Sequence, residues 1–227
     1  MSRDQILSEI RASLRGEAEG ERKRRVQQRL STPPRHQLPE RATRLASQLS
    51  AQFVSCLKEQ STAVIEAGSA EEIPAAAAGF LAKTGAPLRL RLGTDPRLAA
   101  LPWEKSANLV RIEGPADADD KAALSHALAG VAETGTLVLV SGAENPTSLA
   151  FLPGIHIVAV TRGSIVGCYE EAFDLVRSRM GRAMMPRALN LISGASRTGD
   201  IGGRIVMGAH GPRTLCVVIY DEGGKEY

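Results

Sequence analysis

The chain has 227 residues and a formal net charge of +3, and 43% of its residues are hydrophobic and 23% charged. These values are typical of a soluble globular protein, and the length suits one domain with an additional segment. The small net charge does not predict a DNA-binding face, and an aromatic content of 4% disfavours stacking platforms for nucleic-acid bases.

Three cysteines are scattered along the chain, at positions 56, 168 and 216, without any short Cys-x-x-Cys spacing. This argues against an iron–sulfur cluster or a structural zinc ion held by this chain alone. The odd number of cysteines and the lack of a secretory leader predict a reducing, cytoplasmic location. No apolar run approaches the roughly 20 residues that a membrane-spanning helix needs.

The first 40 residues differ in composition from the rest of the chain. Ile6, Ile10 and Leu14 recur on one face, which predicts a short amphipathic helix over residues 2–14. Such a helix is marginal in water by itself, so we expect it to dock on its own domain or on a partner. Residues 16–40 combine an acidic block, a basic block and prolines, typical of a solvated, mobile arm. A partner-binding arm is the alternative.

From residue 41 onward, short apolar runs alternate with helical patterns. Strands are predicted at 63–65, 88–92, 108–112, 136–140, 155–160, 164–167 and 214–220, and helices at 41–58 (with Leu45 on the inner face), 70–83, 117–132 and 169–180. This alternation predicts that residues 41–227 form one α/β domain with a mostly parallel sheet flanked by helices. Ligands of such sheets bind at the carboxyl ends of the strands.

The densest group of chemically active side chains lies between Ser193 and Arg213. A hydroxyl-rich turn after the apolar residues 189–192, opening a helical turn, would present backbone amides and a guanidinium to a carboxylate or phosphate. The spacing matches no phosphate-binding fingerprint. The alternative is that Arg197 and Asp200 pair with each other and the glycines only permit turns. The candidate residues of this segment are Ser196, Arg197, Thr198, Asp200, His210 and Arg213.

Polar candidates also stand at two other junctions. Glu133 follows the helix predicted over 117–132, where a partly buried carboxylate would have a raised pKa suited to proton transfer. Its alternative role is an ion pair or a bond to turn amides. Thr147 and Ser148 follow a turn signal and either bind an anion or cap a short helix. We expect both junctions to converge with residues 193–213.

Two common types of catalytic site are disfavoured. The Gly-x-Ser-x-Gly pattern of serine hydrolases is met only in its first half, around Ser196. The four histidines are dispersed, so no metal site is predicted. His156 lies within a predicted strand and is interpreted as a core residue.

Several of these segments resemble the LUD-domain family, and within it the lactate utilization protein C (LutC/YkgG) branch. They are residues 132–136 (Ala-Glu-Thr-Gly-Thr), 145–158 (from Asn-Pro-Thr-Ser to His-Ile-Val), 193–213 and the opening residues 2–11. The sequence departs from the family pattern at Ala195, where proline is usual, and at Gly202, where an acidic residue is usual.

The resemblance implies a fold of the NagB/RpiA/CoA-transferase group, preceded here by an N-terminal helix and a charged arm. It further implies a part in oxidising L-lactate to pyruvate, beside partner proteins that carry iron–sulfur clusters. No cofactor is predicted on this chain. The resemblance carries over no catalytic residue, so whether the chain is itself an enzyme stays open.

Together, these observations predict a non-iron–sulfur component of a lactate utilisation system with a pocket for a small carboxylate. Arg197 and Arg213 are the predicted anion ligands, and Glu133 or His210 the proton-transfer group. The alternative is a scaffold or assembly protein, with residues 1–40 as its docking elements. A stand-alone enzyme acting on CoA or sugar phosphates rests on fold analogy alone.

Overall fold

The computed structural model describes residues 2–13, 18–32, 37–181, 184–201 and 204–222. Its α-helices are α1 (Arg3–Ser13), α2 (Glu19–Ser31), α3 (Ala46–Glu59), α4 (Ile73–Thr84), α5 (Pro96–Ala99) and α6 (Tyr169–Met180). Short 3-10 helices are η1 (Glu40–Ala42), η2 (Ala70–Glu72), η3 (Trp103–Ser106), η4 (Thr147–Ala150) and η5 (Arg162–Ser164). No described helix is long and apolar enough to span a membrane.

A six-stranded sheet forms the centre of the fold, and all of its pairings are parallel. Its inner strands are buried along almost their whole length, as expected for a parallel sheet covered on both faces. The predicted α/β fold with a mostly parallel sheet is therefore confirmed. The strand order is β1 (Ala63–Ala67), β12 (Thr214–Tyr220), β7 (Ile155–Thr161), β4 (Ala122–His126), β2 (Arg89–Leu92) and β3 (Val110–Glu113).

A second, four-stranded sheet was not predicted as a separate unit. Its strands are β8 (Ile165–Val166), β5 (Ala129–Val131), β6 (Thr136–Val140) and β9 (Leu189–Ile192), in that order. β6 pairs antiparallel with both β5 and β9, whereas β5 and β8 are parallel. A separate antiparallel pair consists of β10 (Arg197–Ile201) and β11 (Arg204–Met207).

The helix predicted over residues 117–132 is wrong, because this stretch forms β4 and β5. Of residues 122–132, all except Leu128 are buried. A run that is buried on both faces has apolar residues at helical spacing by default, so its periodicity cannot separate helix from strand. Asp120, which precedes β4, pairs with the neighbouring strand β2, since its Oδ2 accepts a 2.7 Å bond from Arg91 Nε.

Helices cover both faces of the parallel sheet. On one face, Ile73 and Leu81 of α4 pack against strand residues such as Leu124. On the other, Phe53 and Leu57 of α3 lie between the two sheets. Gly130 allows this contact, because a Cβ there would lie 2.8 Å from the Phe53 ring. The helix α6 covers the second sheet, where its Ala172 and Val176 pack on β5 and β6.

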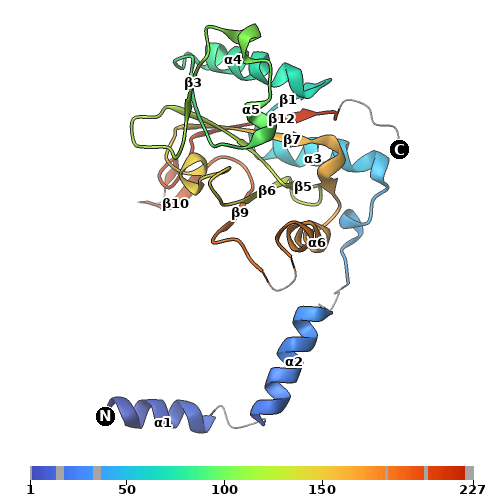
Figure 1. Cartoon of the computed structure of the whole chain (residues 1–227), viewed down its shortest axis with the longest axis vertical. Helices are drawn as coiled ribbons and strands as arrows, with labels where there is room; N and C mark the ends of the chain where they lie inside the picture. The colour runs from blue at the N-terminus through green and yellow to red at the C-terminus, as the bar shows by residue number, and fades with distance from the viewer. Residues whose placement is uncertain (1, 14–17, 33–36, 182–183, 202–203, 223–227) are drawn as a thin grey trace.

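The N-terminal helices lie apart from these layers (Figure 1). Neither α1 nor α2 contains a buried residue, and Ile6 and Ile10 are 44% and 49% exposed. Within the charged stretch, α2 is helical, which its composition did not predict. The division of the chain at residue 40 stays a prediction. Leu45, expected on the buried face of α3, precedes the helix and is 69% exposed.

Candidate functional site

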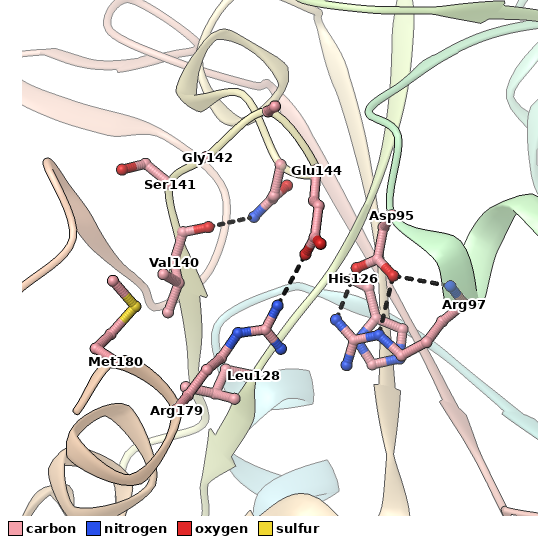
Figure 2. A pocket seen from close by; sticks show the side chains of 12 residues that line it. Asp95, Arg97, His126, Leu128, Val140, Ser141, Gly142, Glu144, Arg179 and Met180 are labelled. Carbon is pink, nitrogen blue, oxygen red and sulfur yellow. Dashed lines mark hydrogen bonds and ion pairs between the residues drawn. The ribbon is translucent and has the colours of Figure 1, made fainter.

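A pocket of about 350 Å³ opens at the carboxyl ends of β2 and β4, and we call it the edge pocket (Figure 2). This is the end of a parallel sheet at which ligands of α/β proteins bind. The strands of the sheet, the loop after β6 and the end of α6 all contribute to its wall. The lining residues are Asp95, Arg97, His126, Leu128, Val140, Ser141, Gly142, Ala143, Glu144, Asn145, Arg179 and Met180.

Asp95 and Arg97 form a fixed ion pair on one side of the edge pocket. Asp95 caps α5 by accepting a 2.9 Å bond from the Arg97 amide, and the proline that follows suits the first turn of a helix. The Arg97 guanidinium donates two more bonds to this carboxylate, at 3.0 and 2.7 Å. Burial alone would raise the pKa of Asp95, but the bonds and charge of Arg97 outweigh it and lower that pKa. The carboxylate is therefore ionised and orients Arg97.

His126 ends β4 and is held through both ring nitrogens. Nδ1 lies 2.7 Å from the carbonyl oxygen of Ala127, which can only accept, so Nδ1 carries the proton. Nε2 then accepts a 2.6 Å bond from the Tyr220 hydroxyl at the end of β12. Burial, followed by the charge of Arg97, lowers the pKa of His126 to about 4. The imidazole is thus neutral near pH 7 and forms a wall of the pocket.

A second ion pair crosses the edge pocket from the loop after β6 to the last turn of α6. Arg179 Nη2 donates a 2.8 Å bond to Glu144 Oε2, and the two side chains are 41% and 49% exposed. The loop reaches this position because Gly93 has no side chain, since a Cβ there would overlap the Glu144 carbonyl group. The residue after β2 therefore fixes where the loop after β6 lies.

Two uncharged groups line the same loop. Asn145 donates through Nδ2 to the Val140 carbonyl oxygen at 3.3 Å, and Ser141 Oγ accepts a 2.8 Å bond from the Ala188 amide. The Ser141 hydroxyl proton and the Asn145 side-chain oxygen appear in no hydrogen bond among the described residues. The edge pocket thus presents two guanidiniums together with a neutral donor and acceptor, a set that suits a small carboxylate with a further polar group.

Residues 193–213 form the β10–β11 hairpin and its flanks, and the expected helical turn at their start is absent. The Ser196 amide donates to the Pro212 carbonyl oxygen at 2.9 Å, and Gly208 donates to Ser196. These bonds close the base of the hairpin. Asp200 is in β10, but its side chain lies outside the described part of the structure.

Arg197, His210 and Arg213 of this hairpin are exposed. Arg197 donates a 3.0 Å bond to the Gln60 carbonyl oxygen, at the end of α3. Among the described residues, His210 bonds only through its backbone amide, 3.4 Å from Ser196 Oγ. The stem of Arg213 packs where a Cβ of Gly208 would stand. Thr198 is half-buried in β10 opposite Val206. None of these residues lines the edge pocket.

Glu133 lies in the turn between β5 and β6, two residues after β5 ends, and its side chain is near Arg41. Its carboxylate is 3.8 Å from Arg41 Nε, and its side chain is 8% exposed. The ion-pair alternative is therefore the arrangement observed. Glu133 lines a hollow beside α3, away from the hairpin residues with which it was expected to converge.

Thr147 and Ser148 form the start of η4, whose cap is Pro146 without a side-chain bond, so neither residue caps the helix. Ser148 Oγ instead accepts a 2.8 Å bond from the Ala116 amide. Thr147 and Arg187 line a shallow hollow next to the edge pocket. Ser141 and Gly142 line both the hollow and the edge pocket. The Thr147–Ser148 segment therefore borders the edge pocket, while Phe151 after η4 approaches Gly211 of the hairpin.

One part of the expected convergence is observed. Ser193 Oγ lies 2.6 Å from Thr136 Oγ1, which also bonds to Thr134 and Tyr169 at 2.7 and 2.8 Å. This hydroxyl cluster ties β9 and α6 to the β5–β6 turn. The interpretation of His156 as a core residue is confirmed, since it is fully buried with Nε2 3.0 Å from Ser125 Oγ.

The main pocket residues were missed by the sequence analysis: Asp95, Arg97, His126, Glu144 and Arg179. A signal existed for one of them, Asp95. Asp95-Pro96 is a helix-start pattern after a predicted strand, at the end where ligands bind. His126 gave none, because it fell within the wrongly predicted helix.

Comparison with known proteins gives a family for the larger part of this site. Residues 116–220 match the family model of the LUD domain. This part of the chain is similar to the LUD domain. The matched residues include His126, Glu144 and Arg179, whereas Asp95 and Arg97 precede them.

The relatives of the chain include proteins named lactate utilization protein C. The one from Bacillus subtilis is 36% identical over 93 residues, which are 40% of this chain and 39% of that protein. The one from Shouchella clausii is 32% identical over 92 residues, 40% of each protein. An uncharacterized protein from Neisseria meningitidis is 31% identical over 124 residues, 55% of this chain and 52% of its own. The chain thus spans about half or less of the length of these relatives.

A solved structure shows the same fold. A DUF162 family protein from Deinococcus radiodurans superposes with a TM-score of 0.59 and 24% sequence identity. The match covers 78% of this chain and 99% of that one. Among the residues that the structure describes, no three His, Cys, Asp or Glu side chains are placed together to hold a metal ion.

Proposed function

We propose that this chain is a component of an L-lactate utilisation system that binds a small carboxylate in the edge pocket. The pair of guanidiniums at the carboxyl edge of the sheet carries this proposal. The names of the relatives direct it to lactate, and pyruvate is the oxidation product that the family resemblance implies. Arg197 and Arg213 of the hairpin are the competing anion ligands, and the same experiment tests them.

The geometry supports a division of roles within the edge pocket. Arg97 is oriented by Asp95 through Nε and Nη2, which leaves Nη1 to face a ligand. Arg179 is held by a single bond and can meet a carboxylate from the opposite side. Ser141 and Asn145 are placed to bond a hydroxyl or keto oxygen on the same ligand. His126, with both nitrogens engaged, excludes water without exchanging protons.

The test is a titration of the full chain with L-lactate and with pyruvate, followed by ligand-observed NMR or calorimetry. We expect saturable binding that Arg179→Gln weakens about tenfold or more, since a charge-assisted bond is lost. The double variant Arg197→Ala/Arg213→Ala serves as the matched control and should bind as the unmodified chain does. Loss of binding in the control alone would move the site to the hairpin, and the absence of binding to the unmodified chain would refute the proposal.

The iron–sulfur partner proteins implied by the family resemblance are part of the same proposal. They would carry the electrons that oxidation of lactate releases, while this chain contributes ligand binding. Co-purification of the tagged full chain from cells grown on L-lactate, with iron and sulfide analysis of the captured complex, tests this division. Capture of the chain alone under those conditions would contradict it.

The scaffold alternative has an observation of its own in α1 and α2, which bury no residue against the rest of the chain. Helices of 11 and 13 residues are marginal in water unless they dock. Deleting residues 1–40 separates the two functions. If the deleted chain still binds carboxylate but no longer enters the complex, these helices are docking elements; unchanged assembly removes the scaffold role.

A further inference from the structure

The two ion pairs of the edge pocket differ in how firmly they are held. Asp95 and Arg97 share two side-chain bonds, and the Asp95 side chain is 3% exposed. Glu144 and Arg179 share one, between side chains that are 49% and 41% exposed. Exposed single-bond pairs contribute at most about 1 kcal/mol, because solvent screens them and both side chains lose rotamer freedom. The Glu144–Arg179 pair is therefore the one that a ligand can open.

The charges that line the edge pocket balance. Asp95 and Glu144 are opposed by Arg97 and Arg179, and the imidazole of His126 is neutral. When a carboxylate replaces Glu144 on Arg179, the half-exposed Glu144 can turn into water. A ligand with one negative charge then restores the balance, whereas a ligand with two leaves one charge unpaired in a partly desolvated site.

Glu144 also has the freedom that such an exchange requires. It lies at the tip of the 141–146 loop, where Gly142 and Asn145 bond each other through their backbones. The backbone is fixed by that turn and by its contact with Gly93. Among the residues that the structure describes, the Glu144 side chain bonds to Arg179 alone, so its departure breaks one bond and leaves the loop in place. Figure 2 shows this carboxylate reaching across the pocket toward Arg179.

We propose that Glu144 is a built-in competitor for Arg179, which the carboxylate ligand displaces and which makes the edge pocket selective for monocarboxylates over dicarboxylates. This inference rests on the proposed carboxylate binding in the edge pocket. It assigns to Glu144 a specificity-determining part that is separate from the positioning of Arg97 by Asp95.

The experiment compares Glu144→Gln with the unmodified full chain, using pyruvate as the monocarboxylate and malonate as the dicarboxylate. Removing the competitor should tighten pyruvate binding about fivefold, the effect of releasing a weak exposed pair. Malonate should bind the unmodified chain more weakly than pyruvate, and it should gain more than pyruvate from the substitution, because one negative charge has been removed. Glu71→Gln makes the same charge change on η2, outside the pocket, and should leave both affinities unchanged.

The outcomes separate the two proposals. If pyruvate binds the unmodified chain and Arg179→Gln weakens it, but Glu144→Gln has no effect, the competitor role is wrong and the proposed function stands. Tighter binding of malonate than of pyruvate to the unmodified chain would overturn the selectivity. If no variant binds either probe, the carboxylate-binding function itself fails. Equal gains in Glu144→Gln and Glu71→Gln would show a long-range charge effect and remove the specific role of Glu144.

Discussion

The edge pocket and the β10–β11 hairpin contain similar side chains in different surroundings. Each offers arginines, a histidine and hydroxyl groups. In the edge pocket, Arg97 is fixed by a buried carboxylate and His126 by two ring bonds. On the hairpin, Arg197 meets one backbone carbonyl, and the His210 side chain is exposed. Partners and burial, more than composition, distinguish the two regions.

The difference arises from what lies beneath each region. Asp95 and His126 lie at the ends of the paired strands β2 and β4, so the register of the parallel sheet sets their positions. The loop after β6 and the last turn of α6 bring Glu144 and Arg179 to the same pocket. The hairpin is a two-stranded ribbon, and such ribbons are marginal unless they pack on other elements. A ligand that needs pre-oriented charges is therefore better served by the edge pocket.

The largest effect that we expect is a loss of folding stability in acid that depends on His126 of the edge pocket and not on His210 of the hairpin. His126 has an ordinary pKa near 6.5 when unfolded and about 4 when folded, so the unfolded state binds the extra proton between these values. His126 should contribute about 3 kcal/mol to the fall in the free energy of unfolding as the pH drops through this window. This contribution is the difference in that fall between the unmodified chain and His126→Gln, followed by urea unfolding between about pH 7 and pH 4.

Two variants assign this acid sensitivity. His126→Gln should make the decline shallower, although it also lowers stability at neutral pH by removing the bond to Tyr220. His156, whose pKa burial lowers to about 3, contributes in the same direction in every variant. His210→Gln, on the exposed hairpin, should leave the slope unchanged. Identical slopes for His126→Gln and the unmodified chain would contradict the assignment.

A smaller effect concerns the loop that completes the edge pocket. Gly93→Ala places a Cβ against the Glu144 carbonyl group, which is backbone and can only move as a whole. We expect a loss of about 2 kcal/mol in urea unfolding, in the range of overpacked sites, together with weaker carboxylate binding. Gly79→Ala, in α4 with no atom within 4 Å of the added Cβ, should be neutral or stabilising. Equal effects of the two substitutions would show that the contact with Glu144 is not limiting.

The smallest expected difference is between two serines that the sequence suggested as anion ligands. Ser148→Ala removes the bond to the part-buried Ala116 amide and should cost about 1 kcal/mol. Ser196→Ala removes a 3.4 Å contact at the exposed hairpin and should change stability by less than about 0.5 kcal/mol. Thermal unfolding of the two variants side by side measures this, and a larger loss for Ser196→Ala would reverse the comparison.

The sequence by itself determined those helices and strands whose pattern of apolar residues fits only one type of secondary structure. The apolar run 214–220 is the central strand β12, and α4 buries Ile73, Ala77 and Leu81 as its periodicity predicts. The family resemblance also came from sequence alone, since its motifs are local. These features depend on neighbours in the chain, which a sequence displays directly.

Only the tertiary structure decided that residues 122–131 are strands and that the edge pocket exists. A fully buried run lacks the polar face from which a helix or strand period is read. Asp95, His126, Glu144 and Arg179 are separated by up to 84 residues in sequence. Asp95 and His126 meet because parallel strands align their carboxyl ends at one edge, and the packing of α6 on the second sheet brings Arg179 and Glu144 to the same pocket. The hairpin looked like a site because its polar residues are adjacent in sequence, but adjacency in the chain provides neither burial nor fixed partners.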